Sequence, residues 1–576
     1  MTLERMSFGE RIVRLFAAEG VDFIFSQGDL TMRDIQKHAV LNGIRVVGPR
    51  HETAAVFMAD AYYRMSGKPQ VAIGAMGPGQ ANLLPAVVCA GQEHVPVIVL
   101  GATRQSDVDS GVRRSRFLHA PVMDCFASIC KYASRITHPG ELDEKVREAF
   151  RQALSGTPGP VYLEYDFVMQ ESEFEFPSSI LRPEQYRVVE QPASSGAIDS
   201  AVEMLANARR PCLLGGTGIH TSLSHESFEG LARILGCPVF TTIGGSGALP
   251  ENDSQWFPYF SEAGQRVLHE CDLVLALGTS FPETMNYGRQ RAFEVGNEDR
   301  QWILVEQDAS AVGVNRTVDL AIIGKLEQVL PQLCNALRDR AYEPASWDLV
   351  SHRCSYEEER RRSVRELSGA NTINASALMN EARESVPNDS VVVVDSGLTV
   401  MHQLAYFEKR SRAFLWTSKY GHLGSGLPYA LGAKLKVGTE RPVCLISGDG
   451  GIGFHFMEFE TAVRHNLAVV VIINDDEALG AEIKAHMDHI GKTIEVSFSP
   501  VRYDLMAQAM GGHGEYVDKL SDIRQAVDRA FASGKPAIVQ VKTDPQGAVK
   551  YPVPYGAELS SWLMEDSKIH SAVYSD

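Results

Sequence analysis

The stretch Ser447–Gly453, SGDGGIG, follows an apolar run and fits the G-x-G-x-x-G pattern of dinucleotide-binding loops. Asp449 stands between the first two glycines, where its carboxylate would repel the pyrophosphate of a dinucleotide. A metal ion would remove this conflict, because a cation can bridge a carboxylate and a diphosphate. The stretch therefore favours a metal-assisted diphosphate site over a site for NAD or FAD.

A second apolar run, LAVVVIIN, follows the loop and ends in Asp475, Asp476 and Glu477. Neighbouring parallel strands present their carboxyl ends at one edge of a sheet, so we expect Asp449 and Asp476 side by side. Two such carboxylates would repel each other without a cation, and Mg²⁺ suits carboxylate and phosphate oxygens. The alternative is a tight turn beside a solvated acidic loop.

The composition limits the class of protein. The chain has 576 residues, 44% of them hydrophobic and 22% charged, which is typical of a globular protein with more than one core. A net charge of -17 argues against a nucleic-acid partner. The nine cysteines are scattered and form no C-x-x-C pair, so we expect reduced thiols. The chain has no membrane-length apolar run and no signal core, so we expect a cytoplasmic protein with no membrane contact.

Three blocks of the chain repeat one order: a short apolar strand, a loop rich in Gly or Ser, and a helix. This order predicts an α/β fold with three doubly wound, mainly parallel-sheet domains. The expected ranges are 1–170, 191–340 and 371–550, followed by a C-terminal tail at 551–576. The tail contains Tyr551, Tyr555 and Trp562, and we expect either a lid over the active site or a plain terminus.

The GDG at 448–450, the apolar strand and the acidic pair resemble the diphosphate motif of thiamine diphosphate (ThDP) enzymes. The resemblance implies that Mg²⁺ is held by Asp449, Asp476 and the backbone carbonyl of Ala478. It also implies that Gly448, Gly450 and Gly451 border the diphosphate. The family usually has Asn where this chain has Asp476. The extra charge should tighten the metal and slightly repel the diphosphate.

The first block supplies the other half of such a site. The run RHETAAVFMADAYYRMSGKP with the following GPGQAN resembles the family's pyrimidine-binding segment, which implies that Glu52 activates the cofactor. Without that resemblance, Glu52 is an acid in the first turn of a helix. The run GHLGSGLPYALGA resembles a further family signature. It implies that Leu423 bends the cofactor and that the Gly421 carbonyl accepts from its amino group, although a Leu before a helix is often only core.

The resemblance covers essentially the whole chain, in the order pyrimidine-binding, central and diphosphate-binding domains. This order is that of the acetolactate synthase, pyruvate oxidase and pyruvate decarboxylase group. In that family one subunit binds the pyrimidine and another the diphosphate. The resemblance therefore implies a homodimer or homotetramer with active sites at the subunit interface, acting on a small molecule.

Three residues resemble polar groups that decarboxylases of the family place near the substrate: Asp29 in a turn after Gly, His119 in a loop, and Glu482 downstream of the diphosphate motif. They would protonate a carbanion after CO₂ leaves. A turn residue, a loop histidine and an exposed helix residue are the alternatives. We expect decarboxylation of a 2-oxo acid with possible carboligation, similar to that of acetolactate synthase.

Two other functions stay open. The run GIGFHFMEFETAVRHN resembles oxalyl-CoA decarboxylase and 2-hydroxyacyl-CoA lyase, so an acyl-CoA is the alternative substrate. Arg209, Arg210 and the loop 215–218 would then meet a nucleotide, unless the loop is a small-residue turn. FAD in the central domain is possible, but SFPETMNYGRQ replaces the usual R-F-D-D-R. A non-catalytic binding protein would not need Glu52.

Overall fold

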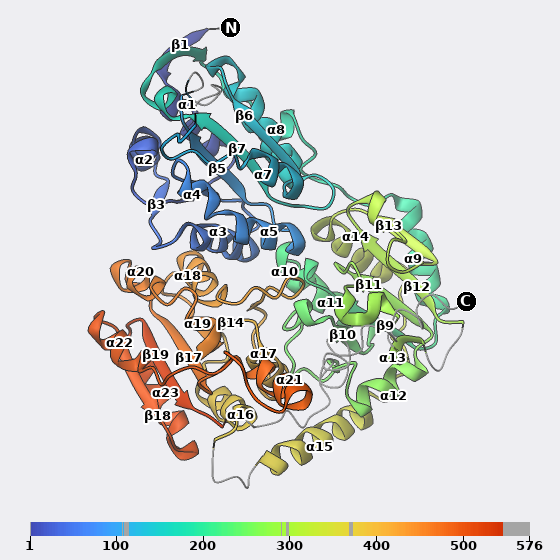
Figure 1. The fold of residues 1–576 in the computed structure, drawn as a ribbon. Coiled ribbons are helices and arrows are strands. Elements are labelled where there is room, and N and C mark those ends of the chain that lie inside the picture. Colours follow the sequence, from blue (N-terminus) through green and yellow to red (C-terminus); the bar gives the residue numbers. More distant parts are fainter. Residues whose placement is uncertain are drawn as a thin grey trace. The chain divides into compact units, whose positions relative to one another are not determined.

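A computed structural model of the chain describes residues 2–105, 108, 114–289, 291–294, 299–367 and 373–544 (Figure 1). The tail at 551–576, where a lid was expected, lies outside these residues. The chain divides into two compact units. The first comprises Met1–Gln191, Leu427–Gly438 and His455–His465, and the second comprises Pro192–Gly426, Thr439–Phe454 and Asn466–Asp576.

The first unit contains a six-stranded parallel sheet in the order β3-β2-β4-β5-β7-β6. Its strands are β2 (Phe23–Phe25), β3 (Arg45–Val47), β4 (Val71–Gly74), β5 (Ile98–Thr103), β6 (Tyr132–Ile136) and β7 (Val161–Asp166). Its longer helices are α1 (Phe8–Ala18), α2 (Arg33–Leu41), α3 (Glu52–Ser66), α5 (Leu84–Glu93), α7 (Met123–Ile129), α8 (Leu142–Leu154), α18 (Gly426–Val437) and α20 (Glu458–Arg464). Strands β1 (Leu3–Ser7) and β8 (Glu173–Pro177) form a separate antiparallel pair.

The second unit contains two parallel sheets. One has the order β10-β9-β11-β12-β13, with β9 (Pro211–Gly215), β10 (Val239–Thr241), β11 (Leu273–Leu277), β12 (Gln301–Glu306) and β13 (Leu320–Ile323). The other has the order β15-β14-β16-β17-β19-β18, with β14 (Val391–Val394), β15 (Phe414–Leu415), β16 (Val443–Gly448), β17 (Val469–Asp475), β18 (His513–Val517) and β19 (Ala537–Lys542). The longer helices are α9 (Ser195–Asn207), α11 (His225–Leu235), α12 (Glu262–Glu270), α14 (Leu326–Asp339), α15 (Leu349–Leu367), α16 (Ala375–Ser385), α17 (Leu398–Tyr406), α21 (Gly480–Ile490), α22 (Tyr503–Ala509) and α23 (Ile523–Ala532).

Continuous apolar strands explain why the sheets are parallel and covered by helices. Strand β14 reads VVVV and β17 reads VVVIIND, and every residue of both is buried. Strands buried on both faces lack the alternation of a half-exposed sheet, which is the pattern of α/β folds. The prediction of three mainly parallel sheets is therefore confirmed. Each predicted domain range contains one of them, while the domain boundaries stay predictions.

All three sheets share one topological feature. In each, the second strand lies on the outer side of the first, so the chain reverses direction next to the first strand. Ligands of open α/β sheets bind at the carboxyl ends of the strands beside such a reversal. In the last sheet this point lies between β14 and β16, directly before Asp449.

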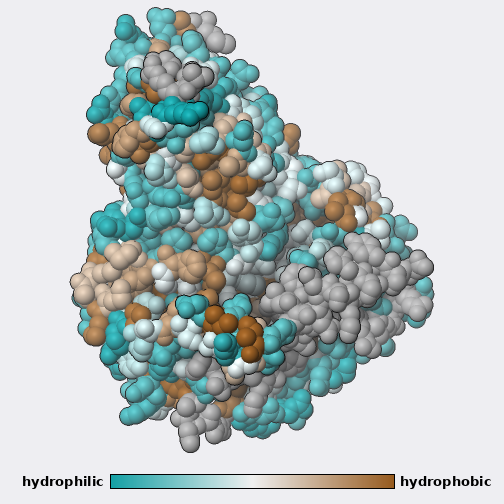
Figure 2. All heavy atoms as spheres, viewed as in Figure 1, coloured by the Kyte–Doolittle hydropathy of each residue, from teal (hydrophilic) through white to brown (hydrophobic). Residues whose placement is uncertain are grey.

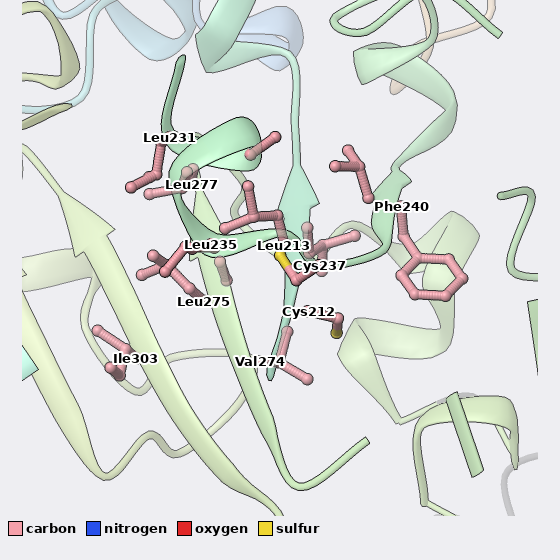
Figure 3. Packing of buried hydrophobic residues seen from close by; sticks show 14 of the residues in the cluster. Cys212, Leu213, Leu231, Leu235, Cys237, Phe240, Val274, Leu275, Leu277 and Ile303 are labelled. Atoms are coloured by element: carbon pink, nitrogen blue, oxygen red, sulfur yellow. The ribbon is translucent and has the colours of Figure 1, made fainter. Parts of the chain in front are cut away.

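The sheet of β9 to β13 has its own hydrophobic core (Figure 3). Leu213 and Leu275 face each other across β9 and β11 and are fully buried. Cys212 and Cys237 are free thiols in the same core. Among the described residues, no helix is both long and apolar enough to pass through a bilayer.

Candidate cofactor and metal site

The two acidic loops predicted to meet do follow neighbouring strands. Strands β16 and β17 pair in parallel, with Gly448 opposite Asn474. Asp449 begins the short helix α19 (Asp449–Ile452) directly after β16, and Asp476 follows β17. Both side chains therefore reach the same edge of the sheet.

Asp449 is a buried carboxylate with an unused oxygen. Its residue is 4% exposed, and its Oδ1 receives no hydrogen bond from any described residue. Its Oδ2 accepts from the backbone N–H of Ala478 at 3.1 Å. Burial, and then the neighbouring carboxylate of Asp476, raise the pKa of Asp449 to about 8. Burial also raises the pKa of Asp476. Such a pair calls for a cation or a shared proton.

The acids on either side of Asp476 are occupied elsewhere. Asp475 accepts from Nε2 of Gln540 at 2.7 Å. Glu477 forms an ion pair with Lys542 at 2.9 Å. Asp449 and Asp476 are thus the carboxylates available to a ligand.

The donor set is two carboxylates plus a backbone carbonyl. Among the described residues, no group of three or more His, Cys, Asp or Glu side chains is placed to hold a metal. Mg²⁺, however, usually takes one or two protein carboxylates and completes its shell with phosphate and water oxygens. The unused Oδ1 of Asp449, the carboxylate of Asp476 and the carbonyl of Ala478 fit that requirement.

The glycines of the loop leave no room for side chains. A Cβ on Gly448 would lie 2.9 Å from Oγ1 of Thr399, and one on Gly451 would lie 2.9 Å from Oδ2 of Asp395. A Cβ on Gly450 would lie 2.9 Å from Cδ2 of Leu479. The close approach of these side-chain atoms therefore favours Gly, since a Cβ at any of the three positions would force a neighbouring side chain to shift.

Asp395 belongs to the same edge, and the sequence analysis missed it. It follows β14, is fully buried, and accepts from the backbone N–H groups of Ser396 and Gly424, both at 2.9 Å. Oγ of Ser447 donates to it at 3.2 Å. Burial raises its pKa to about 6. The signal was present, since the strand SVVVVDSG ends in an acid like the other two.

The turn before α18 is tied to this edge of the sheet, because the backbone N–H of Gly424 in the turn donates to Asp395. Leu423 is half-buried in that turn, and its Cδ2 lies 3.5 Å from where a Cβ on Gly397 would stand. Gly421 has a φ of +66°, which favours Gly, and it is exposed. The structure thus places Leu423 beside the loop that follows β14.

Glu52 lies in the first unit, at the start of α3. Its Oε2 accepts from Nδ2 of Asn82 at 2.9 Å. A Cβ on Gly79 would lie 3.2 Å from its Oε1. The GPGQAN loop therefore holds this carboxylate.

Glu458 is a second buried acid that the sequence analysis did not single out. Its carboxylate accepts from the backbone N–H groups of Arg50 at 2.9 Å and His51 at 3.0 Å. Oγ1 of Thr461 donates to it at 2.8 Å. It is 1% exposed, and burial raises its pKa. Glu458 thus fixes the two residues directly before Glu52.

The three expected proton donors are less enclosed. Asp29 is exposed and accepts from the backbone N–H of Thr31 at 2.8 Å, capping a short 3₁₀ helix. His119 is half-buried, and its Nε2 lies 2.7 Å from Nη2 of Arg116. The backbone of the preceding Leu118 would be 2.8 Å from a Cβ on Gly77. His119 therefore lies near the GPGQAN loop that holds Glu52.

Glu482 lies in the second unit, in the first turn of α21, and is exposed. The same helix carries exposed apolar side chains, Met487 and Ile490, each 50% exposed. Ile494 and Phe498 continue this surface. Figure 2 shows hydrophobic residues gathered over the region of α21. Phe498 also reaches Gly450, so the apolar surface borders the acidic loops.

Comparison with known families accounts for this arrangement. Residues 6–121 match the N-terminal TPP binding domain of thiamine pyrophosphate enzymes. Residues 198–333 match their central domain, and residues 395–541 match their C-terminal TPP binding domain. The chain belongs to the thiamine diphosphate-dependent enzymes.

Relatives of this ThDP enzyme have different activities. A probable acetolactate synthase of Mycobacterium bovis is 29% identical over 562 residues, covering 95% of this chain and 97% of that protein. A 2-hydroxyacyl-CoA lyase of Arabidopsis thaliana is 27% identical over 548 residues, covering 91% and 93%. A sulfoacetaldehyde acetyltransferase of Alcaligenes xylosoxydans xylosoxydans is 26% identical over 582 residues, covering 94% and 93%.

In the central part of the ThDP enzyme, the candidate nucleotide contacts have structural partners. The backbone N–H groups of Arg209 and Arg210 donate to Asp272 at 2.8 and 2.9 Å. The guanidinium of Arg210 lies 4.9 Å from the ring centroid of Trp347. In the loop 215–218, a Cβ on Gly216 or Gly218 would overlap the backbone of Gly278. Close packing of two loops therefore explains these glycines.

Proposed function

We propose that this ThDP enzyme requires Mg²⁺ and breaks or forms a carbon–carbon bond next to a carbonyl group. The observation that carries the proposal is the buried, donor-free Oδ1 of Asp449, facing Asp476 at the ends of two neighbouring strands. Asp449, Asp476 and the carbonyl of Ala478 would hold the metal. Gly448, Gly450 and Gly451 would let a diphosphate approach the backbone.

When bound, ThDP supplies a nucleophilic carbon and accepts the electron pair released as a bond next to the carbonyl breaks. Glu52 would hold a proton at a carboxylate oxygen against the pyrimidine ring, oriented by Asn82 and, through the backbone, by Glu458. Leu423 would support the bent cofactor, and the carbonyl of Gly421 would accept from its amino group.

We propose decarboxylation of a 2-oxo acid, with carboligation as a possible second step, as the reaction. Relatives named acetolactate synthase along nearly the whole chain support this assignment. Asp29, His119 and Glu482 are the proposed donors of the proton that replaces CO₂. The packing of the central glycines gives no support for a nucleotide there, so the proposal includes no FAD.

Cleavage of a 2-hydroxyacyl-CoA is the second candidate reaction. Relatives with that name in Arabidopsis thaliana and Homo sapiens match the chain over more than nine-tenths of its length, and this favours it. The guanidinium of Arg210 pairs with Glu270 and lies over the ring of Trp347, which counts against a role for this side chain in binding the nucleotide of CoA. A non-catalytic binding protein would have no use for the Glu52 and Asn82 pair.

Turnover assays distinguish these functions. We would measure CO₂ release from a panel of 2-oxo acids, and cleavage of 2-hydroxyacyl-CoAs, with and without ThDP and Mg²⁺. Activity that needs both additives supports the enzyme, and the substrate class that reacts identifies the reaction. No turnover on either panel, with ThDP bound, would support the non-catalytic function.

The role of Glu52 has its own test. Glu52→Gln keeps the size and the hydrogen bond from Asn82 but loses the ionisable group. We expect at least a hundredfold loss of turnover with ThDP affinity nearly unchanged, about the size of a general acid–base contribution. The exposed Glu175→Gln variant serves as the control and should keep full activity. Full turnover in Glu52→Gln would mean that another residue activates the cofactor.

A further inference from the structure

The metal site of this chain differs from the usual family pattern in one residue, Asp476. Its partner Asp449 has a buried Oδ1 that no described residue donates to, while Oδ2 accepts from Ala478. An Asn at position 476 would offer an N–H to Asp449, but a carboxylate has no proton to donate. Without a metal, the loop therefore holds two neighbouring, buried carboxyl groups that only a shared proton or a cation can bring together.

The surroundings supply little positive charge, because the charge of Lys542, which acts on Asp476, is shared with Glu477. Neither Asp449 nor Asp476 forms an ion pair with a described residue, and the nearby Lys542 is paired with Glu477. Asp475 adds a further carboxylate, held by Gln540. A divalent cation between Asp449 and Asp476 would relieve this excess of negative charge, whereas a diphosphate alone would increase it.

We propose that the carboxylate of Asp476 makes this loop bind a divalent cation before the cofactor and without it. The inference rests on the proposed function, because it concerns the same metal site. With Asn at position 476, the metal and the diphosphate would each raise the affinity of the loop for the other, so neither would need to bind first. With Asp, the cation binds first, and the diphosphate then docks on a loop whose charge has been reduced.

Mn²⁺ is a suitable probe, because free Mn²⁺ can be counted from its electron paramagnetic resonance signal. The full-length protein, freed of metal and cofactor by chelation and dialysis, would be titrated with Mn²⁺ in the absence of ThDP. We expect one Mn²⁺ per chain, and at least tenfold weaker binding to Asp476→Asn. The control Asp518→Asn removes one exposed acid from the same unit and should bind as the unchanged protein does.

A second titration reverses the order of addition. For each protein, we would measure how much ThDP affinity falls when Mg²⁺ is left out. This loss of affinity should be at least tenfold larger for the unchanged protein than for Asp476→Asn. If the unchanged protein binds Mn²⁺ only after ThDP is added, or if Asp476→Asn binds it equally well alone, the inference is wrong. Should the variant fail to fold, the Mn²⁺ titration of the unchanged protein decides alone.

These outcomes are separate from a failure of the proposed function. If ThDP binds with Mg²⁺ but Mn²⁺ does not bind alone, only the order of binding is refuted. If ThDP does not bind under any metal condition, the proposed function fails, while a bound Mn²⁺ would still show the cation site.

Discussion

At the scale of single residues, burial decides how the chain responds to acid. His402 on α17 is 1% exposed and shares a hydrogen bond with Oγ of Ser376 at 2.8 Å. Burial lowers its pKa to about 4. In the unfolded chain a histidine has a pKa near 6.5. Between about pH 6.5 and 4, His402 is therefore protonated in the unfolded state and neutral in the folded state, so protonation favours unfolding. His402 therefore destabilises the fold by about 3 kcal/mol as pH falls through this range.

We predict that His402→Gln, which can keep a hydrogen bond to Ser376, flattens the loss of stability between pH 6.5 and 4. The measurement is the urea concentration at the midpoint of unfolding of the second unit, taken at several pH values. The slope of this midpoint against pH is compared between the proteins. The exposed His489→Gln variant should follow the unchanged protein. Equal slopes for all three proteins would show that His402 takes up its proton in the folded state.

At the scale of elements, the start of α3 depends on a residue far away in the sequence. Glu458 begins α20 and accepts the backbone N–H groups of Arg50 and His51, which precede Glu52. A buried N–H that loses its acceptor costs about 1–3 kcal/mol. The position of the Glu52 carboxylate therefore depends on packing between α3 and α20.

We predict that Glu458→Ala lowers the free energy of unfolding of the first unit by about 2 kcal/mol. We also expect turnover to fall at least tenfold while ThDP affinity stays close to normal, because only the orientation of Glu52 changes. The control is Glu460→Ala, which removes partly exposed side-chain pairs with Arg464 and Arg50 but leaves the backbone N–H bonds to Glu458, and it should cost less than about 0.5 kcal/mol. If Glu458→Ala were less stable but kept normal turnover, Glu458 would stabilise the fold without orienting Glu52.

At the scale of the whole molecule, the first and last sheets share one strand order, and the proposed pyrimidine and diphosphate residues belong to different compact units. We propose, as the family resemblance implies, a homodimer or homotetramer whose active sites join two chains. The exposed apolar surface over α21 supports this assembly, since such surfaces often mark interfaces.

Subunit mixing tests this assembly. Glu52→Gln and Asp449→Asn should each be inactive. If an active site takes Glu52 from one chain and Asp449 from another, a mixed dimer contains one intact site, and random mixing should restore about a quarter of the full activity. The variants would be mixed after dissociation and assayed beside each variant alone. No recovery, with mixed dimers shown by native mass spectrometry, would place both residues of a site on one chain.

Much of the fold and the site could be read from local patterns. The continuous Val and Ile runs predicted buried parallel strands, and acids directly after two of them predicted the meeting of Asp449 and Asp476. Asp395 and Glu458 were missed for different reasons. Asp395 carries the same signal as its neighbours, a strand ending in an acid, whereas Glu458 looks like any acid at the start of a helix.

The sequence by itself determined the three parallel sheets, because burial on both faces demands apolar strands, and it determined the acids at their ends. Only the tertiary structure decided which polar groups those acids meet. Packing left Oδ1 of Asp449 without a donor among the described residues, surrounded Asp395 with donors such as Gly424 and Ser447, and set Glu458 against the backbone before Glu52. Such contacts depend on how distant segments pack, since a hydrogen bond requires an approach within about 3 Å that no local pattern encodes.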